Sequence, residues 1–246
     1  MARVCHASSL AIARVTTRIT CDWRDVERSL WERGYARLPG VLTTTECESL
    51  VAMYGDETRF RSRIDMARHR FGVGDYKYFA APLPGLVASL RTELYPPLAS
   101  IANRWMEALA SDERYPATLD DFLVRCAARG QTKPTPLLLH YERGGYNCLH
   151  QDIYGDVAFP LQVVLFLSRP GADYTGGEFL LVEQRPRAQS AGEVIAGEQG
   201  ELLVFTTRIR PAASSRGYSR VNIRHGVSRL HSGARYTLGI IFHDAR

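Results

Sequence analysis

Two kinds of hydrophobic periodicity divide the chain into an N-terminal and a C-terminal half. In the N-terminal half, apolar residues recur at helical spacing and follow good capping residues. Asp22 can cap a helix that ends at Gly34, and Thr43-x-x-Glu46 is a capping-box pattern that opens a second helix. We predict helices over 22–34, 43–54, 84–110 and 118–129. Pro96-Pro97 predicts a break or kink in the third of them.

The C-terminal half has the pattern of short strands. LPGVL (38–42) already predicts one strand, and residues 59–80 predict strand and loop. From Pro134 onward, seven short apolar runs are separated by Gly, Pro and Ser, which is typical of an all-β sandwich or barrel. Because helices come first and strands second, we expect an α+β, mostly β chain with helices packed outside one β core.

The length of 246 residues fits one domain of this kind. We expect a single domain over 21–246, with helical support and substrate-side loops in 21–130 and the β core in 131–246. The first twenty residues, MARVCHASSLAIARVTTRIT, contain three Arg and no acidic residue, which suggests a transit peptide. We favour a disordered tail over residues 1–20, or an upstream start codon.

Composition excludes several classes without choosing a function. Hydrophobic residues make up 45% and charged residues 23%, which are ordinary globular values, and no apolar run has the length of about 18 residues that a membrane span needs. The five cysteines form no C-x-x-C pair, which favours a reducing, cytoplasmic location over disulfides or a structural zinc site. The net charge is +5, and almost all the basic residues are Arg. Because of this compositional bias, the charge is weak evidence for nucleic-acid binding.

Candidate chemistry begins in the stretch GGYNCLHQD (144–152). If CLHQDI is a strand, His150 and Asp152 point to the same face, and Cys148 shares that face. A third histidine from another strand would complete a two-His, one-carboxylate set, which favours non-haem Fe(II) with open positions. The candidates are His225, His231 and His243, with His140 and His69 less favoured.

A buried arginine is the second candidate group. On a strand, residues 235, 237, 239, 241 and 243 share one face, which would place Arg235 and Thr237 beside the metal. An arginine inside a barrel is costly unless it meets an anion, and its guanidinium can bind a carboxylate with two hydrogen bonds.

Taken together, His150-x-Asp152, His225 and Arg235 ten residues later resemble the iron- and 2-oxoglutarate-dependent dioxygenases. HGVSRLHSGARYTL (225–238) is similar to their second motif, and TGGEF (175–179) resembles a turn of the prolyl 4-hydroxylase-like branch. The resemblance implies a double-stranded β-helix, or jelly roll. It also implies Fe(II) bound by His150, Asp152 and His225, and 2-oxoglutarate held by Arg235, Thr237 and Tyr141, with O2 as the third reactant.

A closer resemblance is to a bacterial oxygenase family proposed to dealkylate damaged DNA by oxidation. It is carried by DMARHRFGVGDYKYF, PTPLLLHYERGGYNCLHQD, YTGGEF, LVEQRPRAQS and VNIRHGVSRLHSG. The ten-residue interval from His225 to Arg235 is nearer the prolyl hydroxylase pattern than that of the well-known DNA-dealkylating dioxygenases. The resemblance to the bacterial family implies hydroxylation of a C–H bond in alkylated nucleic acid, with release of succinate and CO2. The alternatives are a hydroxylase of prolyl residues, amino acids or small metabolites, and a non-catalytic, cupin-like metal-binding protein.

Two basic regions are candidates for substrate contact. Basic and aromatic residues alternate in the first, as suits single-stranded nucleic acid and nearly as well a peptide, and the candidates there are Arg68, His69, Arg70, Tyr76 and Tyr78, with Arg61 and Arg63 beside them. The second region is the acid-free stretch 202–243, where a phosphate-binding surface or an ordinary solvated face would contain Arg208, Arg210, Arg216, Arg220, Arg224 and Arg229. We expect His231 to be exposed and His243 to be a core or rim histidine.

Overall fold

The computed structural model describes residues 19–185, 187–215 and 217–246. The expected tail over 1–20 therefore lies, up to residue 18, outside the described residues. The helices are α1 (Trp23–Arg33), α2 (Thr44–Met53), η1 (Glu57–Arg59), α3 (Met66–His69), α4 (Gly85–Ala108) and α5 (Leu119–Ala127). The first six strands are β1 (Tyr35–Leu38), β2 (Phe60–Asp65), β3 (Gly72–Val73), β4 (Asp75–Phe79), β5 (Leu137–Glu142) and β6 (Tyr146–His150). The others are β7 (Leu161–Phe166), β8 (Tyr174–Gly176), β9 (Phe179–Gln184), β10 (Ala191–Ile195), β11 (Leu202–Thr206), β12 (Ile209–Ser214), β13 (Gly217–Val227) and β14 (Leu230–Ile240).

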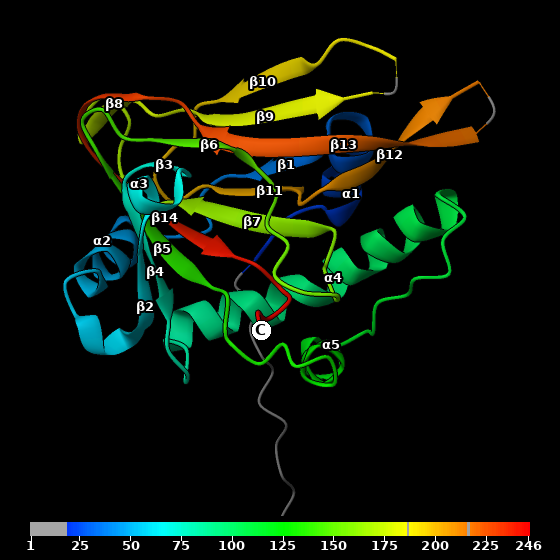
Figure 1. Ribbon diagram of the computed structural model, residues 1–246, viewed down its shortest axis with the longest axis horizontal. Helices are drawn as coiled ribbons and strands as arrows, with labels where there is room; N and C mark the ends of the chain where they lie inside the picture. The colour runs from blue at the N-terminus through cyan, green and yellow to red at the C-terminus, as the bar shows by residue number, and fades with distance from the viewer. Residues whose placement is uncertain (1–18, 186, 216) are drawn as a thin grey trace, which may run out of the picture.

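The strands form two antiparallel sheets that lie face to face (Figure 1). The major sheet has the order β1-β11-β7-β14-β5-β4-β2, and the minor sheet has the order β10-β9-β13-β6-β3. Helix α4 runs along the outer side of the major sheet, and the minor sheet forms the opposite layer. This arrangement, mostly β with supporting helices, confirms the predicted jelly-roll class.

Two of the predicted helix starts are confirmed in atomic detail. The Asp22 carboxylate accepts a hydrogen bond of 2.8 Å from the backbone N–H of Arg24, and Gly34 ends α1 in the left-handed conformation. The capping box of Thr43 and Glu46 opens α2, with both of its reciprocal hydrogen bonds present. Local capping chemistry therefore fixes where these helices begin.

One local prediction is wrong, and another is wrong in part. The strand expected at 38–42 lies earlier, as β1, because Pro39 cannot donate a ladder hydrogen bond and Gly40 has a φ of 66° that turns the chain. Of the break or kink predicted at Pro96 and Pro97, the break does not occur, because helix α4 is continuous there. One face of α4 is buried in the largest hydrophobic cluster, which also contains residues of the major sheet, and this packing outweighs the loss of two helix hydrogen bonds.

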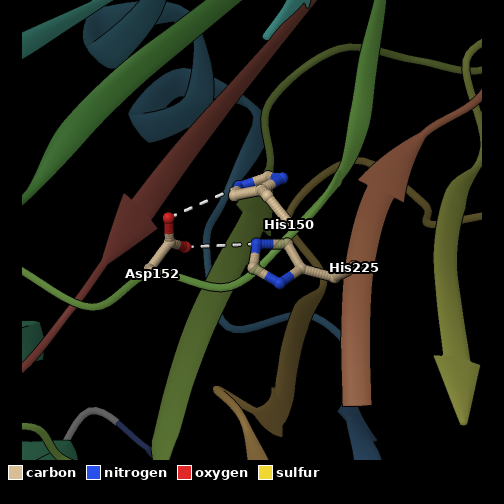
Figure 2. A group of neighbouring side chains, drawn as sticks. All are labelled: His150, Asp152 and His225. Atoms are coloured by element: carbon tan, nitrogen blue, oxygen red, sulfur yellow. Dashed lines mark ion pairs between the residues drawn. The ribbon is translucent and has the colours of Figure 1, made fainter. Parts of the chain in front are cut away.

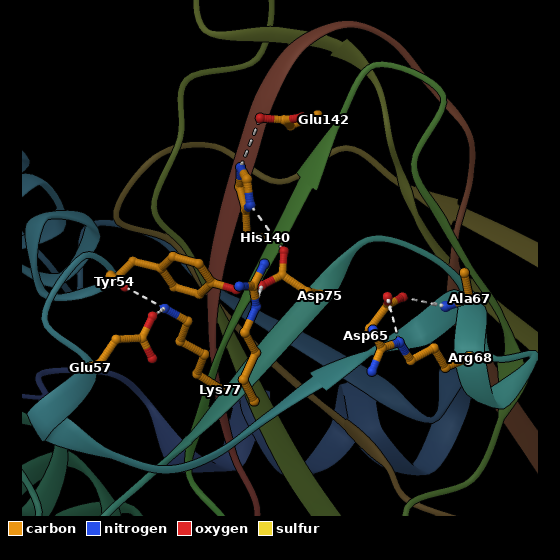
Figure 3. A network of polar contacts seen from close by, with 10 residues as sticks. Tyr54, Glu57, Asp65, Ala67, Arg68, Asp75, Lys77, His140 and Glu142 are labelled. Carbon is orange, nitrogen blue, oxygen red and sulfur yellow. Dashed lines mark hydrogen bonds and ion pairs between the residues drawn. The ribbon is translucent and has the colours of Figure 1, made fainter.

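A polar network joins α2 and η1 to strands β2, β4 and β5 (Figure 3). Asp75 is its centre: Oδ2 accepts from the Tyr54 hydroxyl and from Arg63 Nε at 2.9 Å, and Oδ1 lies 3.3 Å from His140 Nδ1. Lys77 Nζ donates to the Tyr54 carbonyl at 2.8 Å and to Glu57 at 2.6 Å. We call these six residues the Asp75 network.

The remaining global observations concern membranes and cysteines. No helix among the described residues is long and apolar enough to cross a membrane. The four cysteines in the described ranges, Cys21, Cys47, Cys126 and Cys148, are free thiols. The expected reducing, cytoplasmic location remains a prediction.

Candidate active site

Two histidines and one aspartate converge between the two sheets (Figure 2). His150 ends β6 and is paired directly with His225 on β13, so that their ring centroids are 4.2 Å apart. Asp152 Oδ1 lies 3.4 Å from His150 Nε2, and Asp152 Oδ2 lies 3.1 Å from His225 Nε2. One donor atom from each residue lies within 4.8 Å of the other two, a grouping that could hold a metal ion.

A bulge in β6 sets the direction of these side chains. His225 pairs with His150 and Val227 pairs with Asn147, so a step of two residues on β13 spans a step of three residues on β6. Asn147 and His150 therefore both line the cavity, and Asn147 Nδ2 donates to the Tyr141 hydroxyl at 3.3 Å. The regular alternation expected between Cys148 and His150 is interrupted here, although Cys148 does line the cavity as an exposed residue.

Asp152 does not lie on a strand, contrary to the expectation that CLHQDI is one. It belongs to the loop after β6, two residues beyond the last ladder position. The hydroxyl of Tyr154 donates a hydrogen bond of 2.7 Å to Asp152 Oδ1 and so fixes the carboxylate that the ladder leaves free. The Tyr154 ring in turn packs edge-on against Tyr78 and faces His243.

The pKa shifts of Asp152 and His225 favour the forms that bind a metal ion, whereas that of His150 does not. Burial alone raises the pKa of Asp152, but the charge of His225 and the hydrogen bond from His150 hold it well below its ordinary value. Burial and repulsion from His150 lower the pKa of His225. Burial lowers the pKa of His150, yet the hydrogen bond and charge of Asp152 outweigh this and raise it. An ionised carboxylate and a neutral imidazole are the forms that bind divalent metals.

Arg235 lies on β14, in the major sheet, and is almost fully buried. Its Nε and Nη1 atoms have no hydrogen-bond partner, while its guanidinium carbon lies 5.6–5.9 Å from the ring centres of Tyr141, Phe166 and Tyr174. Gly177, with a φ of 67°, makes room for it, since a Cβ there would lie 3.2 Å from Arg235 Cδ. A buried cation with unpartnered donors matches an anionic ligand.

A cavity of about 340 Å³ contains both halves of this site. Its wall includes the three metal-facing residues and also Arg235, Thr237 and Tyr141, the three residues expected to hold 2-oxoglutarate. Thr237 is buried on β14, and Gly239 and Ile241 continue the same wall, as the strand alternation predicted. The structure therefore brings all six residues together, although their roles stay predictions.

Sequence reasoning missed Gln162, the one polar residue within the β7 sequence LQVVLF. Its side chain is buried in the cavity wall, with Nε2 3.4 Å from His225 Nε2 and with Oε1 unpartnered. A lone amide in an otherwise apolar strand was the available signal. Tyr154 was also missed, because only the tertiary structure brings its hydroxyl to Asp152.

The predicted substrate residues divide into two groups. Arg68, His69 and Arg70 are exposed, in and directly after α3, and Arg70 lines the cavity. Tyr76 is part of the cavity wall, whereas Tyr78 is buried with its ring packed edge-on against Tyr76.

Among the arginines of the acid-free stretch, Arg210 belongs neither to a phosphate-binding surface nor to a solvated face. Arg210 is buried, with its Nε donating to Glu183 at 2.9 Å, and is therefore a structural residue. Arg208, Arg220, Arg224 and Arg229 are not buried, and Arg216 lies outside the described residues.

The other two candidate histidines are where the sequence suggested. His231 is exposed, and His243 is buried with Nδ1 accepting a hydrogen bond of 3.2 Å from the Phe159 backbone N–H. Both predictions are confirmed.

Comparison with known proteins identifies relatives of the whole site region. Residues 74–245 match the family Oxygenase-NA, described as an oxygenase catalysing oxidative methylation of damaged DNA. An uncharacterised protein of Mycobacterium tuberculosis strain H37Rv is 53% identical over 167 residues, which cover 68% of this chain and 72% of that protein.

Solved structures share the fold at low sequence identity. A prolyl-4-hydroxylase of Pseudomonas putida superposes with a TM-score of 0.51 at 14% identity, covering 91% of this chain and 99% of that one. An oxidoreductase of the 2OG-Fe(II) oxygenase family from Burkholderia pseudomallei gives 0.51 at 14% identity, covering 91% of both chains. The family match confirms that the chain is an oxygenase, and the solved structures share its fold. The chain belongs to the Oxygenase-NA family and has the fold of the 2-oxoglutarate- and Fe(II)-dependent oxygenases.

Proposed function

We propose that the protein uses Fe(II) and 2-oxoglutarate to hydroxylate an alkyl carbon of a modified nucleobase. The main support for this proposal is that one cavity contains both a two-His, one-carboxylate group and, on the opposite sheet, a buried guanidinium without a hydrogen-bond partner. The first suits Fe(II) with open coordination positions, and the second suits the far carboxylate of a dicarboxylic acid.

The residues present fit both groups. His150, Asp152 and His225 would hold the iron, while Arg235 would pair the far carboxylate of 2-oxoglutarate through two hydrogen bonds. Burial raises the pKa of Tyr141, so its hydroxyl stays protonated; it already accepts from Asn147 and can donate to the same carboxylate. Thr237 offers a second hydroxyl on the Arg235 strand.

Bound iron would supply the oxidation, in which one atom of O2 enters succinate as 2-oxoglutarate loses CO2 and the other enters a C–H bond of the substrate. The protein orients the cosubstrate along β14 and keeps the reaction centre inside a cavity. If the hydroxylated carbon is an N-methyl group, the C–N bond then breaks and releases formaldehyde. Such an oxidation removes a methyl group from a damaged base and leaves the amine.

The nucleic-acid substrate is supported by the family description and by the exposed Arg68, His69 and Arg70 beside the cavity. We further propose that residues 21–246 act as one domain. The largest hydrophobic cluster supports this, because it joins Val26 of α1 and Leu50 of α2 to Leu165 and Leu238 of the major sheet.

Anaerobically iron-loaded protein, supplied with 2-oxoglutarate and then air, tests the proposal. We expect N-methylated oligonucleotides to yield formaldehyde and succinate in equal amounts, and unmethylated ones to yield no formaldehyde. Asp152→Ala is the matched control and should abolish both products, which would also exclude a non-catalytic metal-binding protein. Hydroxylation of prolyl peptides or free amino acids, with no product from any oligonucleotide, would refute the nucleic-acid substrate.

A further inference from the structure

Exposed apolar side chains gather at the opening of the cavity. Phe71 and Leu149 line the cavity yet are 47% and 43% exposed, and Val73 and Ile153 close by are 43% and 36% exposed. The other large hydrophobic residues exposed within the described ranges lie elsewhere: Val124 on α5, Val194 on β10 and Tyr218 on β13. We call residues 68–73 with Leu149 and Ile153 the rim. An exposed apolar cluster beside a cavity is typical of a surface that binds a ligand or a macromolecular partner.

The rim combines a flat aromatic stack with unneutralised positive charge. The rings of His69 and Phe71 are stacked, with centroids 5.4 Å apart and an interplanar angle of 20°. Between them Arg70 is exposed, lines the cavity and has no carboxylate partner among the described residues. The nearby Asp65 already accepts from the Ala67 N–H at 3.0 Å and pairs with Arg68 at 3.5 Å (Figure 3). Two arginines therefore face one acidic group here.

Main-chain contacts hold the rim in place without a ligand. The Phe71 carbonyl accepts a hydrogen bond of 2.7 Å from Cys148 N–H, and Phe71 N–H donates to the Met66 carbonyl at 3.0 Å. Gly72 has a φ of 141°, and a Cβ there would lie 2.2 Å from the Tyr146 carbonyl oxygen. Arg70 itself has a left-handed backbone, with a φ of 60°. A segment held this way presents the Phe71 ring with little ordering cost on binding.

We propose that the rim is the docking surface for a single strand of nucleic acid. A base next to the modified one stacks on the Phe71–His69 pair, Arg68 and Arg70 pair with its phosphates, and the modified base enters the cavity. This inference rests on the proposed function. It is favoured because aromatic faces and arginines together bind single strands without needing a particular sequence.

The depth of the reaction centre explains the preference for a single strand. The side chains of Asp152 and His225 are 14% and 7% exposed, although that of His150 is 35% exposed, so a base has to enter the cavity to reach all three. The base must leave its stack, at a cost of a few kcal/mol that a single strand largely avoids. The exposed rings of the rim would replace the stacking contacts that the neighbouring base loses.

Fluorescence anisotropy with the iron-loaded, full-length protein tests this, using a 12-nucleotide strand that contains one N-methylated base and its duplex. We expect the single strand to bind at least tenfold more tightly than the duplex. Phe71→Ala should weaken single-strand binding about tenfold with an unchanged salt dependence, since one stacked base contributes about 1–3 kcal/mol. Phe71→Trp should bind the single strand at least as tightly as the wild type. This result would show that a substitution at this position does not by itself unfold the protein.

Arg70→Gln should instead reduce the slope of log affinity against log salt by about 0.7, the value for one phosphate contact on a single strand. Tyr218→Ala and Arg129→Gln, exposed residues of the same types elsewhere, should change neither quantity.

Suppose that the wild-type protein releases formaldehyde from oligonucleotides, so that the proposed function stands. The inference is then overturned if Phe71→Ala binds the single strand as tightly as the wild type does, or if the wild type binds the duplex and the single strand with equal affinity. Failure of the proposed function is separate, because it appears as no product from any oligonucleotide in the wild-type protein. If a proline-containing peptide binds the rim and Phe71→Ala abolishes it, the rim serves a peptide.

Discussion

The Asp75 network and the cavity contain similar types of polar side chain. They differ in how many of their buried polar atoms have a hydrogen-bond partner. In both, a histidine nitrogen lies close to an aspartate oxygen: 3.3 Å from His140 to Asp75 and 3.4 Å from His150 to Asp152. In both, a tyrosine hydroxyl donates to that aspartate. Distances alone would not separate a structural network from an active site.

The difference lies in the buried atoms left over. No buried side-chain atom of the Asp75 network lacks a partner among the described residues, whereas His225 Nδ1, Gln162 Oε1, Arg235 Nε and Arg235 Nη1 in the cavity have none. An unpartnered buried polar atom costs about 1–3 kcal/mol. Such atoms gathered in one cavity indicate that ligands complete it, and this separates the two regions better than residue type does.

The largest expected effect comes from replacing each of the two aspartates by alanine. Asp152→Ala should lower oxoglutarate-dependent turnover by about 10³-fold or more, because it removes a proposed ligand of the iron. Asp75→Ala should retain iron affinity within about threefold and instead lower the free energy of unfolding by about 3 kcal/mol, since it leaves His140 and Arg63 without their carboxylate. Anaerobic iron titration and urea denaturation measure the two quantities. Loss of iron binding in Asp75→Ala would remove the distinction.

The next largest effect distinguishes two buried arginines. Arg235→Met should raise the KM for 2-oxoglutarate about 100-fold, by loss of a charge-assisted pair, without destabilising the cosubstrate-free protein. Arg210→Met should lower the free energy of unfolding by roughly 2–3 kcal/mol, since Glu183 loses a buried partner. Steady-state kinetics and urea denaturation provide the readouts. If Arg235→Met unfolded the protein as readily as Arg210→Met, the guanidinium would be structural.

A smaller effect is expected from the two tyrosine hydroxyls. Tyr154→Phe frees the Asp152 carboxylate to rotate, so the affinity for Fe(II) should fall about 10- to 100-fold with the fold intact. Tyr54→Phe removes the equivalent hydroxyl from Asp75 and should leave the iron affinity unchanged. Anaerobic calorimetric titration of both variants checks this. Equal iron affinities in the two variants would show that Tyr154 does not position the ligand.

The smallest effect is a pH dependence confined to the Asp75 network. Burial alone would raise the pKa of Asp75, but hydrogen bonds from His140 and Tyr54 and the charge of Arg63 lower it from 3.8 to about 2. A carboxyl with a lowered pKa in the folded state stabilises the protein above its unfolded pKa and loses that contribution as the pH falls through the folded value. The stability advantage of the wild type over Asp75→Asn should therefore shrink by about 2 kcal/mol between pH 4 and pH 2. Denaturant titrations across this range test it, and a constant difference would contradict it.

Much of the fold follows from local sequence chemistry. Helix caps at Asp22 and Thr43, and short apolar runs punctuated by Gly and Pro after residue 134, predicted the elements and their class. Pro96 and Pro97 were misjudged because tertiary packing of α4 decided the outcome, and that packing is invisible in a local window.

The candidate site was predictable as a set of residues but not as a geometry. The spacing of His150, Asp152, His225 and Arg235, with the family resemblance that added Tyr141 and Thr237, named six residues that line one cavity. The bulge at β6, the loop position of Asp152 and the support from Tyr154 depend on pairing with a strand some 75 residues away. Periodicity within one strand contains no information about that pairing.

The site is shared between two layers of the fold. His150 and His225 belong to the minor sheet, and Arg235 belongs to the major sheet. A metal with its dicarboxylate would thus act as a non-covalent cross-link between the sheets. Its binding would raise the free energy of unfolding. Supply of the two small molecules would then govern how long the folded protein survives heat and proteolysis, so that cofactor starvation shortens its lifetime as well as stopping its chemistry.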